Sequence, residues 1–289
     1  MKTSRVNYRN TKVDGLNIFY REAGSTDAPL VLLLHGYPTS SHMFRNLIPL
    51  LSEKYHVIAP DLPGFGYSDK PDHKDLAYTF DNLTKYIQGF IDQLGLKRFA
   101  IYVFDYGAPV GYRLAVANPE KITGIISQNG NAYLEGLSEG WSPIQRYWAE
   151  PTEGNRNALK MMVEEGTTKW QYLAGVADET LVAPESYTLD QHFLDQPGNV
   201  DIQLDLFKDY ASNVALYPVF QQYFRDMQPA FLAAWGDKDP FFLPPGAEAF
   251  KRDIPGATVK FFDTGHFALE THVNEIGTEI LAFLEKLPK

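Results

Sequence analysis

Three polar side chains in this sequence could together carry out covalent catalysis: Asp105, Asp239 and His266. Asp105 follows the apolar run Phe99–Phe104 and lies two residues before Gly107, a pattern typical of a sharp strand-to-helix turn that exposes a nucleophile. Asp239 and His266 follow two later apolar runs, where an acid can fix the orientation of a histidine base. The order of nucleophile, acid and base along the chain therefore predicts a catalytic triad.

Backbone N–H groups could stabilise negative charge beside this nucleophile. Tyr37 follows a His-Gly pair at the end of an apolar run, and Tyr106 directly follows Asp105. Donors at these two places form the oxyanion hole of hydrolases that carry a nucleophile at such a turn, so we predict that role for Tyr37 and Tyr106. The competing interpretation is that Asp105 only caps the following helix, a common role for Asp at the end of a strand.

Two further residues resemble members of the triad. His35 precedes Gly36, but His266 fits the position of a general base better, so we expect His35 to tie its own loop together. Asp237 lies in the same loop as Asp239 and closer to its strand, and we expect Asp237 to be solvated.

Short apolar runs alternate with helical periodicity along the chain, which predicts an α/β fold with a mostly parallel central sheet and covering helices. The predicted strands are Asn17–Arg21, Leu30–His35, His56–Pro60, Phe99–Phe104, Thr123–Gln128, Phe231–Trp235 and Thr258–Phe262. Strand signals stop in residues 131–226, which are helical in pattern and rich in Trp and Tyr. We therefore predict a core of residues 1–130 and 227–289, with residues 131–226 inserted as a helical cap over the carboxyl edge of the sheet.

The composition limits the partners that the protein can have. The chain carries 26 Lys and Arg against 36 Asp and Glu, a net charge of −10, which argues against binding to nucleic acid or an anionic membrane. It has no cysteine, no apolar run long enough to span a membrane and no metal or nucleotide motif. These features predict a cytoplasmic protein that uses no cofactor and no metal. We expect it to be a monomer or homodimer whose partners are a small apolar organic substrate and water.

Three stretches of sequence resemble the epoxide hydrolase and haloalkane dehalogenase branch of the α/β-hydrolase superfamily, and the resemblance covers nearly the whole chain. They are HGYPTSSHMFRNLIPLL (His35–Leu51), APDLPGFGYSD (Ala59–Asp69) and FDYGAPVGYRLA (Phe104–Ala115). The resemblance implies an α/β-hydrolase fold with an inserted helical cap. One departure is Val103, because relatives usually have a small residue two positions before the nucleophile; crowding there could narrow the site.

An aspartate nucleophile narrows the reaction on chemical grounds. A carboxylate that attacks a saturated carbon forms an alkyl ester, and water activated by His266 can hydrolyse that ester at its carbonyl carbon. The substrate should therefore carry a leaving group on saturated carbon, as an epoxide or an alkyl halide does.

The residues around Asp105 favour an epoxide, which would be hydrolysed to a diol. Resembling dehalogenases bind the halide through a Trp after the nucleophile and often an Asn after the His-Gly pair, whereas this chain has Tyr106 and Tyr37 there. Many also carry the triad acid at the position of Asn129, which cannot serve as a charge. Resembling epoxide hydrolases protonate the ring oxygen with two cap tyrosines, for which Tyr147 and Tyr210 are the candidates by spacing.

Several alternatives stay open in the cap. Tyr187 or Tyr217 could serve in place of either tyrosine, and most cap tyrosines could simply pack. Trp141 and Trp148 are expected to line a dry, apolar pocket over Asp105, and they could supply the halide donors of a haloalkane dehalogenase, which is the second interpretation. A third interpretation is a non-catalytic ligand-binding protein of the same fold, although such a protein has no need of a triad.

Overall fold

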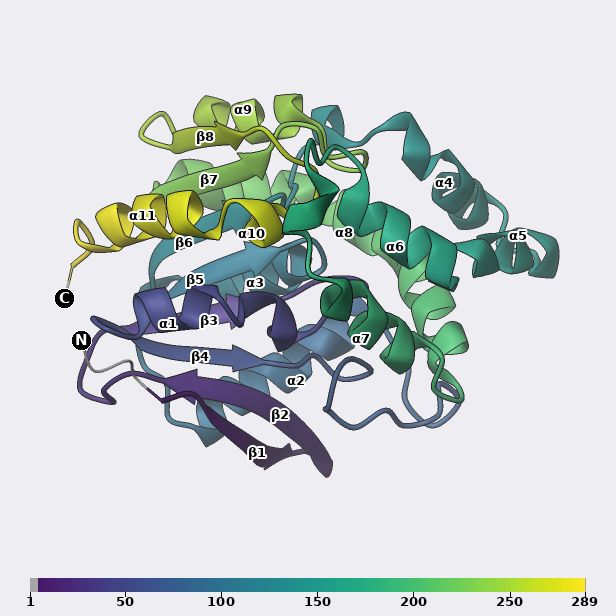
Figure 1. The fold of residues 1–289 in the computed structure, drawn as a ribbon, viewed down its shortest axis with the longest axis horizontal. Helices are drawn as coiled ribbons and strands as arrows, with labels where there is room; N and C mark the ends of the chain where they lie inside the picture. The colour runs from purple at the N-terminus through teal and green to yellow at the C-terminus, as the bar shows by residue number, and fades with distance from the viewer. Residues whose placement is uncertain (1–4, 289) are drawn as a thin grey trace.

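The computed structural model describes residues 5–288 and is built around one eight-stranded sheet (Figure 1). The strand order across the sheet is β1-β2-β4-β3-β5-β6-β7-β8, in which β2 is antiparallel to its neighbours β1 and β4 and all other pairings are parallel. The strands are β1 (Asn7–Val13), β2 (Leu16–Ala23), β3 (Leu30–Leu34), β4 (His56–Pro60), β5 (Phe99–Phe104), β6 (Ile122–Gln128), β7 (Phe231–Gly236) and β8 (Thr258–Phe262). This confirms the predicted mostly parallel sheet.

The central strands are apolar on both faces because helices cover both sides of the sheet. Every residue of β4, β5 and β7 is buried, which explains why their sequences are continuous apolar runs rather than alternating ones. The edge strand β1 was not predicted, because its sequence, NYRNTKV, is polar and mostly exposed. Polar residues at an exposed edge discourage pairing with another chain, and the same property hides the strand from pattern analysis.

Helices of the core pack against both faces of the sheet (Figure 1). The helices α2 (Phe80–Gln93) and α3 (Gly107–Ala117) contact each other on one face, together with α9 (Pro244–Asp253). On the other face α1 (Leu47–Leu51) contacts α11 (Val273–Leu284), which follows the short α10 (Ala268–Thr271). The two buried clusters of apolar side chains, one on each face, fix the sheet that carries the site.

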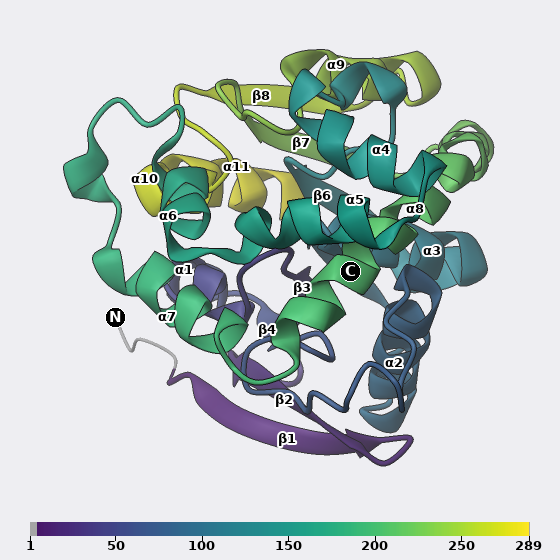
Figure 2. The same ribbon diagram turned by 90° about the vertical axis from the view of Figure 1, so that its right-hand side faces the viewer.

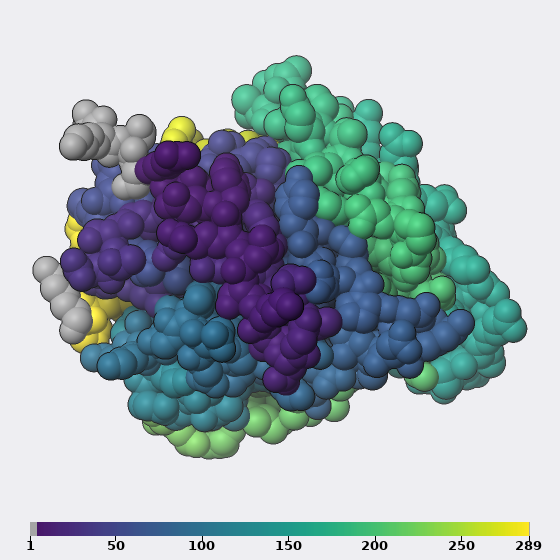
Figure 3. Space-filling view, turned by 90° about the horizontal axis from the view of Figure 1, so that it is seen from below, coloured from purple at the N-terminus to yellow at the C-terminus, as the bar shows by residue number. Residues whose placement is uncertain are grey.

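Five α-helices are inserted between β6 and β7 along the chain: α4 (Ser142–Ala149), α5 (Glu153–Ala158), α6 (Glu165–Leu173), α7 (Pro184–Leu194) and α8 (Asn199–Met227). They gather beyond the carboxyl ends of the parallel strands (Figures 1 and 2). The space-filling view shows this segment along one side of the molecule, beyond the N-terminal hairpin (Figure 3). The predicted inserted helical region is therefore present, while its limits as a separate domain, 131–226, stay a prediction.

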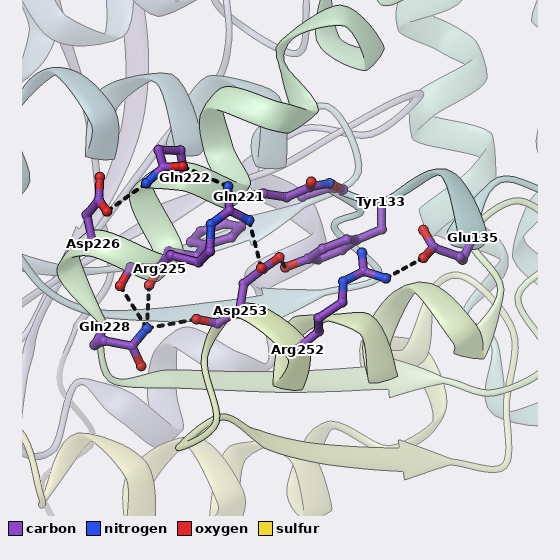
Figure 4. Close-up of polar contacts among 11 residues, drawn as sticks. Tyr133, Glu135, Gln221, Gln222, Arg225, Asp226, Gln228, Arg252 and Asp253 are labelled. Carbon is purple, nitrogen blue, oxygen red and sulfur yellow. Dashed lines mark hydrogen bonds and ion pairs between the residues drawn. The ribbon is translucent and has the colours of Figure 1, made fainter.

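The two junctions of the inserted segment meet at one residue of the core, Asp253 at the end of α9 (Figure 4). The Tyr133 hydroxyl, near the start of the segment, donates to Asp253 Oδ2 at 2.8 Å. Near the end of the segment, Arg225 Nη1 donates to Asp253 Oδ1 at 2.8 Å, and Gln228 Nε2 donates to the Asp253 backbone oxygen at 2.8 Å. The carboxylate is buried and paired with a charged donor, so its charge-assisted hydrogen bonds to Tyr133 and Arg225 hold both junctions to the core.

No helix formed by residues 5–288 is both long and apolar enough to cross a membrane.

Candidate active site

Asp105 lies at the turn between β5 and α3, where the sequence predicted a nucleophile. Its φ is +46°, in the left-handed region that costs a residue with a side chain on the order of 1–3 kcal/mol. Two glycines permit this turn: a Cβ at Gly107 would lie 2.4 Å from the Leu34 oxygen, and a Cβ at Gly36 would lie 2.4 Å from Asp105 Cβ. The strained turn is held in place because Gly36 packs against Asp105 and Gly107 packs against the backbone of Leu34.

The predicted crowding at Val103 is absorbed by a glycine on the next helix. A Cβ at Gly111 would lie 2.3 Å from Val103 Cγ1, so the absence of a side chain there makes room for the branched residue. The turn at Asp105 therefore keeps its shape although Val103 is not small.

The backbone amides of Tyr37 and Tyr106 both point at the Asp105 carboxylate. Tyr37 N donates to Asp105 Oδ1 at 2.6 Å, and the Tyr106 N–H forms a second hydrogen bond to the carboxylate. These are the two donors that the sequence predicted. One carboxylate oxygen is thus held where an oxyanion would develop, while Oδ2 lies on the side of His266.

His266 and Asp239 form a buried hydrogen-bonded pair beside Asp105. His266 Nδ1 and Asp239 Oδ2 are 2.7 Å apart, so Nδ1 carries the proton and the lone pair of Nε2 is free. His266 Nε2 lies 4.0 Å from Asp105 Oδ2. The structure therefore brings together the three side chains that were predicted to form the triad.

Asp239 is fixed by two further donors. Asn129 Nδ2 donates to Asp239 Oδ2 at 2.7 Å, and the Phe241 N–H donates to Asp239 Oδ1 at 2.7 Å. Asn129 also accepts from the Gly236 N–H at 3.0 Å, at the end of β7. The sequence indicated that Asn129 could not act as the acid, and in the structure its amide instead holds the residue predicted to be the acid.

Burial dominates the electrostatics of the site. It raises the pKa of Asp105 from 3.8 to about 6, against the opposing effects of the His266 charge and the two backbone N–H groups. Burial also acts to lower the pKa of His266, but the charge and hydrogen bond of Asp239 and the charge of Asp105 together raise it above its usual value. A carboxylate that is ionised but poorly solvated is a reactive nucleophile, and an imidazole beside two carboxylates is a strong base.

His35 and Asp237 lie outside this cluster. His35 is fully buried, accepts from the Leu62 N–H at Nε2 and contacts the Gly36 oxygen through Nδ1 at 3.0 Å. Both ring nitrogens are therefore occupied by the main chain, as expected for a histidine that ties its loop together. Asp237 is exposed, in agreement with its predicted solvation.

Two tyrosines of α8 face the site, and only one of them was a first choice from the sequence. Tyr210 and Tyr217 are hydrogen-bonded to each other, and Asp105 is among the charges that raise the pKa of each, after the larger effect of burial. Asn131 Nδ2 donates to the Tyr217 hydroxyl at 3.3 Å. A spacing of seven residues is two helical turns, so the two residues share one face of α8; that spacing is the signal that could have identified Tyr217.

Tyr147, the other first choice, belongs to a different polar cluster. Its hydroxyl accepts from Arg156 Nη1 at 3.2 Å, and Arg156 is ion-paired with the partly exposed Asp201 and Asp205. These contacts connect α5 to α8 on the outer part of the inserted segment. The structure thus pairs Tyr210 with Tyr217 rather than with Tyr147. Tyr187 contacts Tyr172 and lies outside the Tyr210–Tyr217 pair.

Trp141 and Trp148 pack against Tyr210, with ring centroids 4.5 Å and 6.2 Å away, and their role as pocket walls stays a prediction. Their indole N–H groups are already used: Trp141 donates to the Phe241 oxygen at 3.1 Å, and Trp148 donates to the Phe207 oxygen at 2.7 Å. This corrects the expectation that these indoles could hold a halide, because a donor satisfied by the backbone has no hydrogen bond left to give.

One buried hydroxyl near Asp105 has no partner within residues 5–288, and it belongs to Tyr106. Its ring packs against Tyr37, Phe80 and Tyr210. A buried polar group without a hydrogen bond is costly, which makes this hydroxyl a candidate contact for a ligand.

A cavity of about 780 Å³ lies at the other end of the parallel strands, away from their carboxyl ends, and is lined by Pro29, Lys54, Arg98 and Leu287 among others. Open α/β folds bind ligands at the carboxyl ends of their strands, so the cluster around Asp105 is the better candidate site. Among residues 5–288, no group of three or more His, Asp and Glu side chains is placed to hold a metal ion.

Comparison with known proteins identifies relatives of this chain in sequence and in fold. The sequence matches the family model described as alpha/beta hydrolase fold over residues 29–273. It is 46% identical over 273 residues to an uncharacterized hydrolase of Saccharomyces cerevisiae, YNR064C, with 93% of each chain covered. A haloalkane dehalogenase of Psychrobacter cryohalolentis is 26% identical over 283 residues, which cover 95% of this chain and 89% of that enzyme. The structure of epoxide hydrolase VrEH1 from Vigna radiata shares the fold with a TM-score of 0.77 at 22% identity, covering 97% of this chain and 98% of that one.

Proposed function

This chain belongs to the alpha/beta hydrolase fold family, and from the geometry of its site we propose that it hydrolyses epoxides to diols through an ester formed on Asp105. The observation that carries the proposal is the pairing of a carboxylate nucleophile, at a strained turn between two backbone donors, with a His-Asp couple. A carboxylate in this position matches attack on saturated carbon. The aromatic walls favour a small apolar substrate, and neither step below requires a cofactor.

In the first step, Asp105 Oδ2 attacks a carbon of the epoxide, and the bond from that carbon to the ring oxygen breaks. Oδ1 stays hydrogen-bonded to the Tyr37 amide, and the Tyr106 amide also bonds to the carboxylate, while Oδ2 attacks the substrate. The ring oxygen takes a proton from the hydroxyl of Tyr210 or Tyr217, and the product of this step is an alkyl ester on Asp105.

In the second step, His266 Nε2 takes a proton from water, and the water oxygen attacks the Asp105 carbonyl carbon. The negative charge that develops on Oδ1 lies between the Tyr37 and Tyr106 amides. Collapse of this intermediate breaks the bond to the substrate oxygen, which takes the proton from His266 and leaves as the second hydroxyl of the diol. The other proton of the water is left on the Asp105 carboxyl group and passes to the tyrosinate formed in the first step, which restores the starting state. Asp239 stabilises the imidazolium that forms in between.

The preference for an epoxide over a halide is supported by the donors that the site offers. A departing alkoxide needs a proton, which the two buried phenols can provide. A departing halide needs hydrogen-bond donors, and the indole N–H groups of Trp141 and Trp148 are bonded to the backbone instead.

Hydrolytic dehalogenation is the second candidate, and one observation favours it. The unpartnered Tyr106 hydroxyl directly follows the nucleophile and could donate to a halide as it could to an alkoxide. The similarity to a haloalkane dehalogenase over most of the chain keeps this candidate in consideration.

Trapping of the ester tests both candidates. The His266→Gln variant should lose the base of the second step and keep the first, so intact-protein mass spectrometry should show the mass of the substrate added to the protein. Styrene oxide should give this adduct, and 1-bromohexane should give an alkyl adduct only if the second candidate is correct. An Asp105→Ala variant that turns over styrene oxide as fast as the wild type would exclude the proposal.

A further inference from the structure

The last residue of β6, Gln128, links the main chain of His266 to the sheet. Gln128 Nε2 donates to the His266 backbone oxygen at 3.1 Å. Gln128 Oε1 in turn accepts from the hydroxyl of Tyr102 in β5. Tyr102 and Gln128 are fully buried, and His266 is 1% exposed. The catalytic steps derived above use neither Tyr102 nor Gln128.

We propose that Gln128, braced by Tyr102, is a positioning residue that holds the His266 main chain so that Nε2 faces the ester on Asp105. The inference rests on the proposed function, because it concerns the base of the second step. Gln128 acts through His266 and makes no contact with substrate.

The register of the sheet explains why Gln128 is suited to this role. In the parallel pairing of β5 with β6, Gln128 lies opposite Phe104, the residue directly before Asp105. It is also paired with Ala234 of β7, the strand that precedes the Asp239 loop. Gln128 therefore lies between the strand that leads to Asp105 and the strand that leads to Asp239.

Two anchors together define where the imidazole lies. Asp239 holds the ring through Nδ1, and Gln128 holds the backbone oxygen of the same residue. The Phe104 ring packs against the imidazole, with centroids 4.6 Å apart. A histidine anchored only at Nδ1 could pivot about Asp239, whereas one anchored at both ends keeps Nε2 at a fixed distance from Asp105.

The brace between Tyr102 and Gln128 fixes which way the amide points. Burial raises the pKa of Tyr102 well above its usual value, so the hydroxyl keeps its proton and donates. The His266 backbone oxygen can only accept, so the amide nitrogen must face it, and the amide oxygen is left to accept from the Tyr102 hydroxyl. Without the brace, the amide could rotate and present its oxygen to the His266 oxygen, where two acceptors would repel each other.

The two catalytic steps depend differently on this arrangement. Formation of the ester needs Asp105 and a proton donor, while hydrolysis of the ester needs His266 as a base. Removal of the amide should therefore slow hydrolysis about 10- to 100-fold, the cost of a small misplacement of a catalytic group, and leave formation of the ester within about threefold. A purely structural contact would change both steps together or neither.

The experiment compares Gln128→Met, which preserves side-chain volume, with Tyr102→Phe and with the double variant. Each is mixed with excess styrene oxide and quenched at intervals, and the fraction of protein carrying the ester is measured by mass spectrometry. We expect Gln128→Met to accumulate close to one ester per protein in the steady state, and Tyr102→Phe to accumulate less. Tyr133→Phe is the matched control, because it removes a buried phenol hydrogen bond, to Asp253, on the other face of the sheet and away from the triad.

The double variant separates positioning from stability. Gln128→Met alone leaves the Tyr102 hydroxyl buried without an acceptor, and adding Tyr102→Phe removes that hydroxyl. We expect the double variant to regain part of the lost thermal stability and to remain slow in hydrolysis. Recovery of hydrolysis in parallel with stability would show that Gln128 supports only the fold.

The outcomes distinguish this inference from the proposed function. If His266→Gln accumulates the ester and Gln128→Met does not, the positioning role is wrong and the proposed function stands. If His266→Gln accumulates no ester with any epoxide or halide, the proposed function is wrong and the role of Gln128 falls with it.

Discussion

Replacement of Asp105, the proposed nucleophile, should make the protein more stable while abolishing the proposed activity. Asp105 is 7% exposed, and burial is the main reason that its pKa rises from 3.8 to about 6. A carboxyl group with this change on folding costs about 3 kcal/mol of folding free energy when it is ionised. Asp105→Asn removes that charge while the amide oxygen can still accept from the Tyr37 N–H and the amide nitrogen can donate towards His266 Nε2.

The sign of the pH dependence follows from proton binding. Between pH 4 and pH 6 the folded protein holds a proton on Asp105 that the unfolded chain has lost, so the stability contributed by this group falls as the pH rises. Asp105→Asn does not titrate. The variant should therefore match the wild type below about pH 4 and exceed it by about 3 kcal/mol above pH 7, which corresponds to about 5–10 °C in Tm.

Thermal unfolding of the two proteins from pH 4 to pH 8 checks this prediction, with intact mass used to verify that the amide persists. The control is Asp237→Asn, which removes a charge from an exposed side chain at the site's edge and should leave Tm unchanged. If Asp105→Asn is less stable than the wild type at pH 8, or if the difference does not grow with pH, the carboxylate is not the strained and desolvated group described above.

Three other predictions concern Asp105 and the residues around the predicted triad. Tyr210→Phe and Tyr217→Phe should each slow formation of the ester with epoxides about 10-fold or more in single-turnover measurements, because each removes a phenol that can protonate the ring oxygen. Tyr147→Phe should change this rate by no more than about twofold. A larger loss in Tyr147→Phe than in Tyr217→Phe would favour Tyr147 and Tyr210 as the proton donors. Asn129→Leu should lower kcat by about 10-fold with little change in the rate of ester formation, since it releases Asp239; an equal loss in both steps would contradict this. The rate of ester formation should fall as the pH drops through about 6, where Asp105 takes up a proton, and a rate that does not change between pH 5 and pH 8 would exclude Asp105 as the nucleophile.

The sequence allowed the core of the site to be predicted because its signals are local. Asp105 and Gly107 lie within one turn, and the glycine is required there by the close approach of Leu34. The buried strands are continuous apolar runs, so the places where they end could be recognised, and with them the positions of Asp239 and His266.

The remaining features depend on contacts between residues far apart in the chain. Gln128 and His266 are 138 residues apart, and a Gln at the end of a strand carries no signal of what its amide meets. Tyr147 and Tyr217 could not be ranked from composition, because the difference lies in whether Arg156 or Asn131 reaches the hydroxyl. The edge strand β1 was missed because its partner β2, rather than its own pattern, makes it a strand.

Incorporation of oxygen from water into Asp105 is the most direct test of the central claim. The wild-type protein is given less than one equivalent of styrene oxide in H₂¹⁸O, and both the product and the peptide that contains Asp105 are examined by mass spectrometry. If hydrolysis occurs at the carbonyl carbon of an Asp105 ester, the heavy oxygen appears in the Asp105 carboxylate and the diol of this first turnover is unlabelled. A labelled diol together with an unlabelled Asp105 would mean that water attacks the substrate directly, and it would contradict the proposed mechanism.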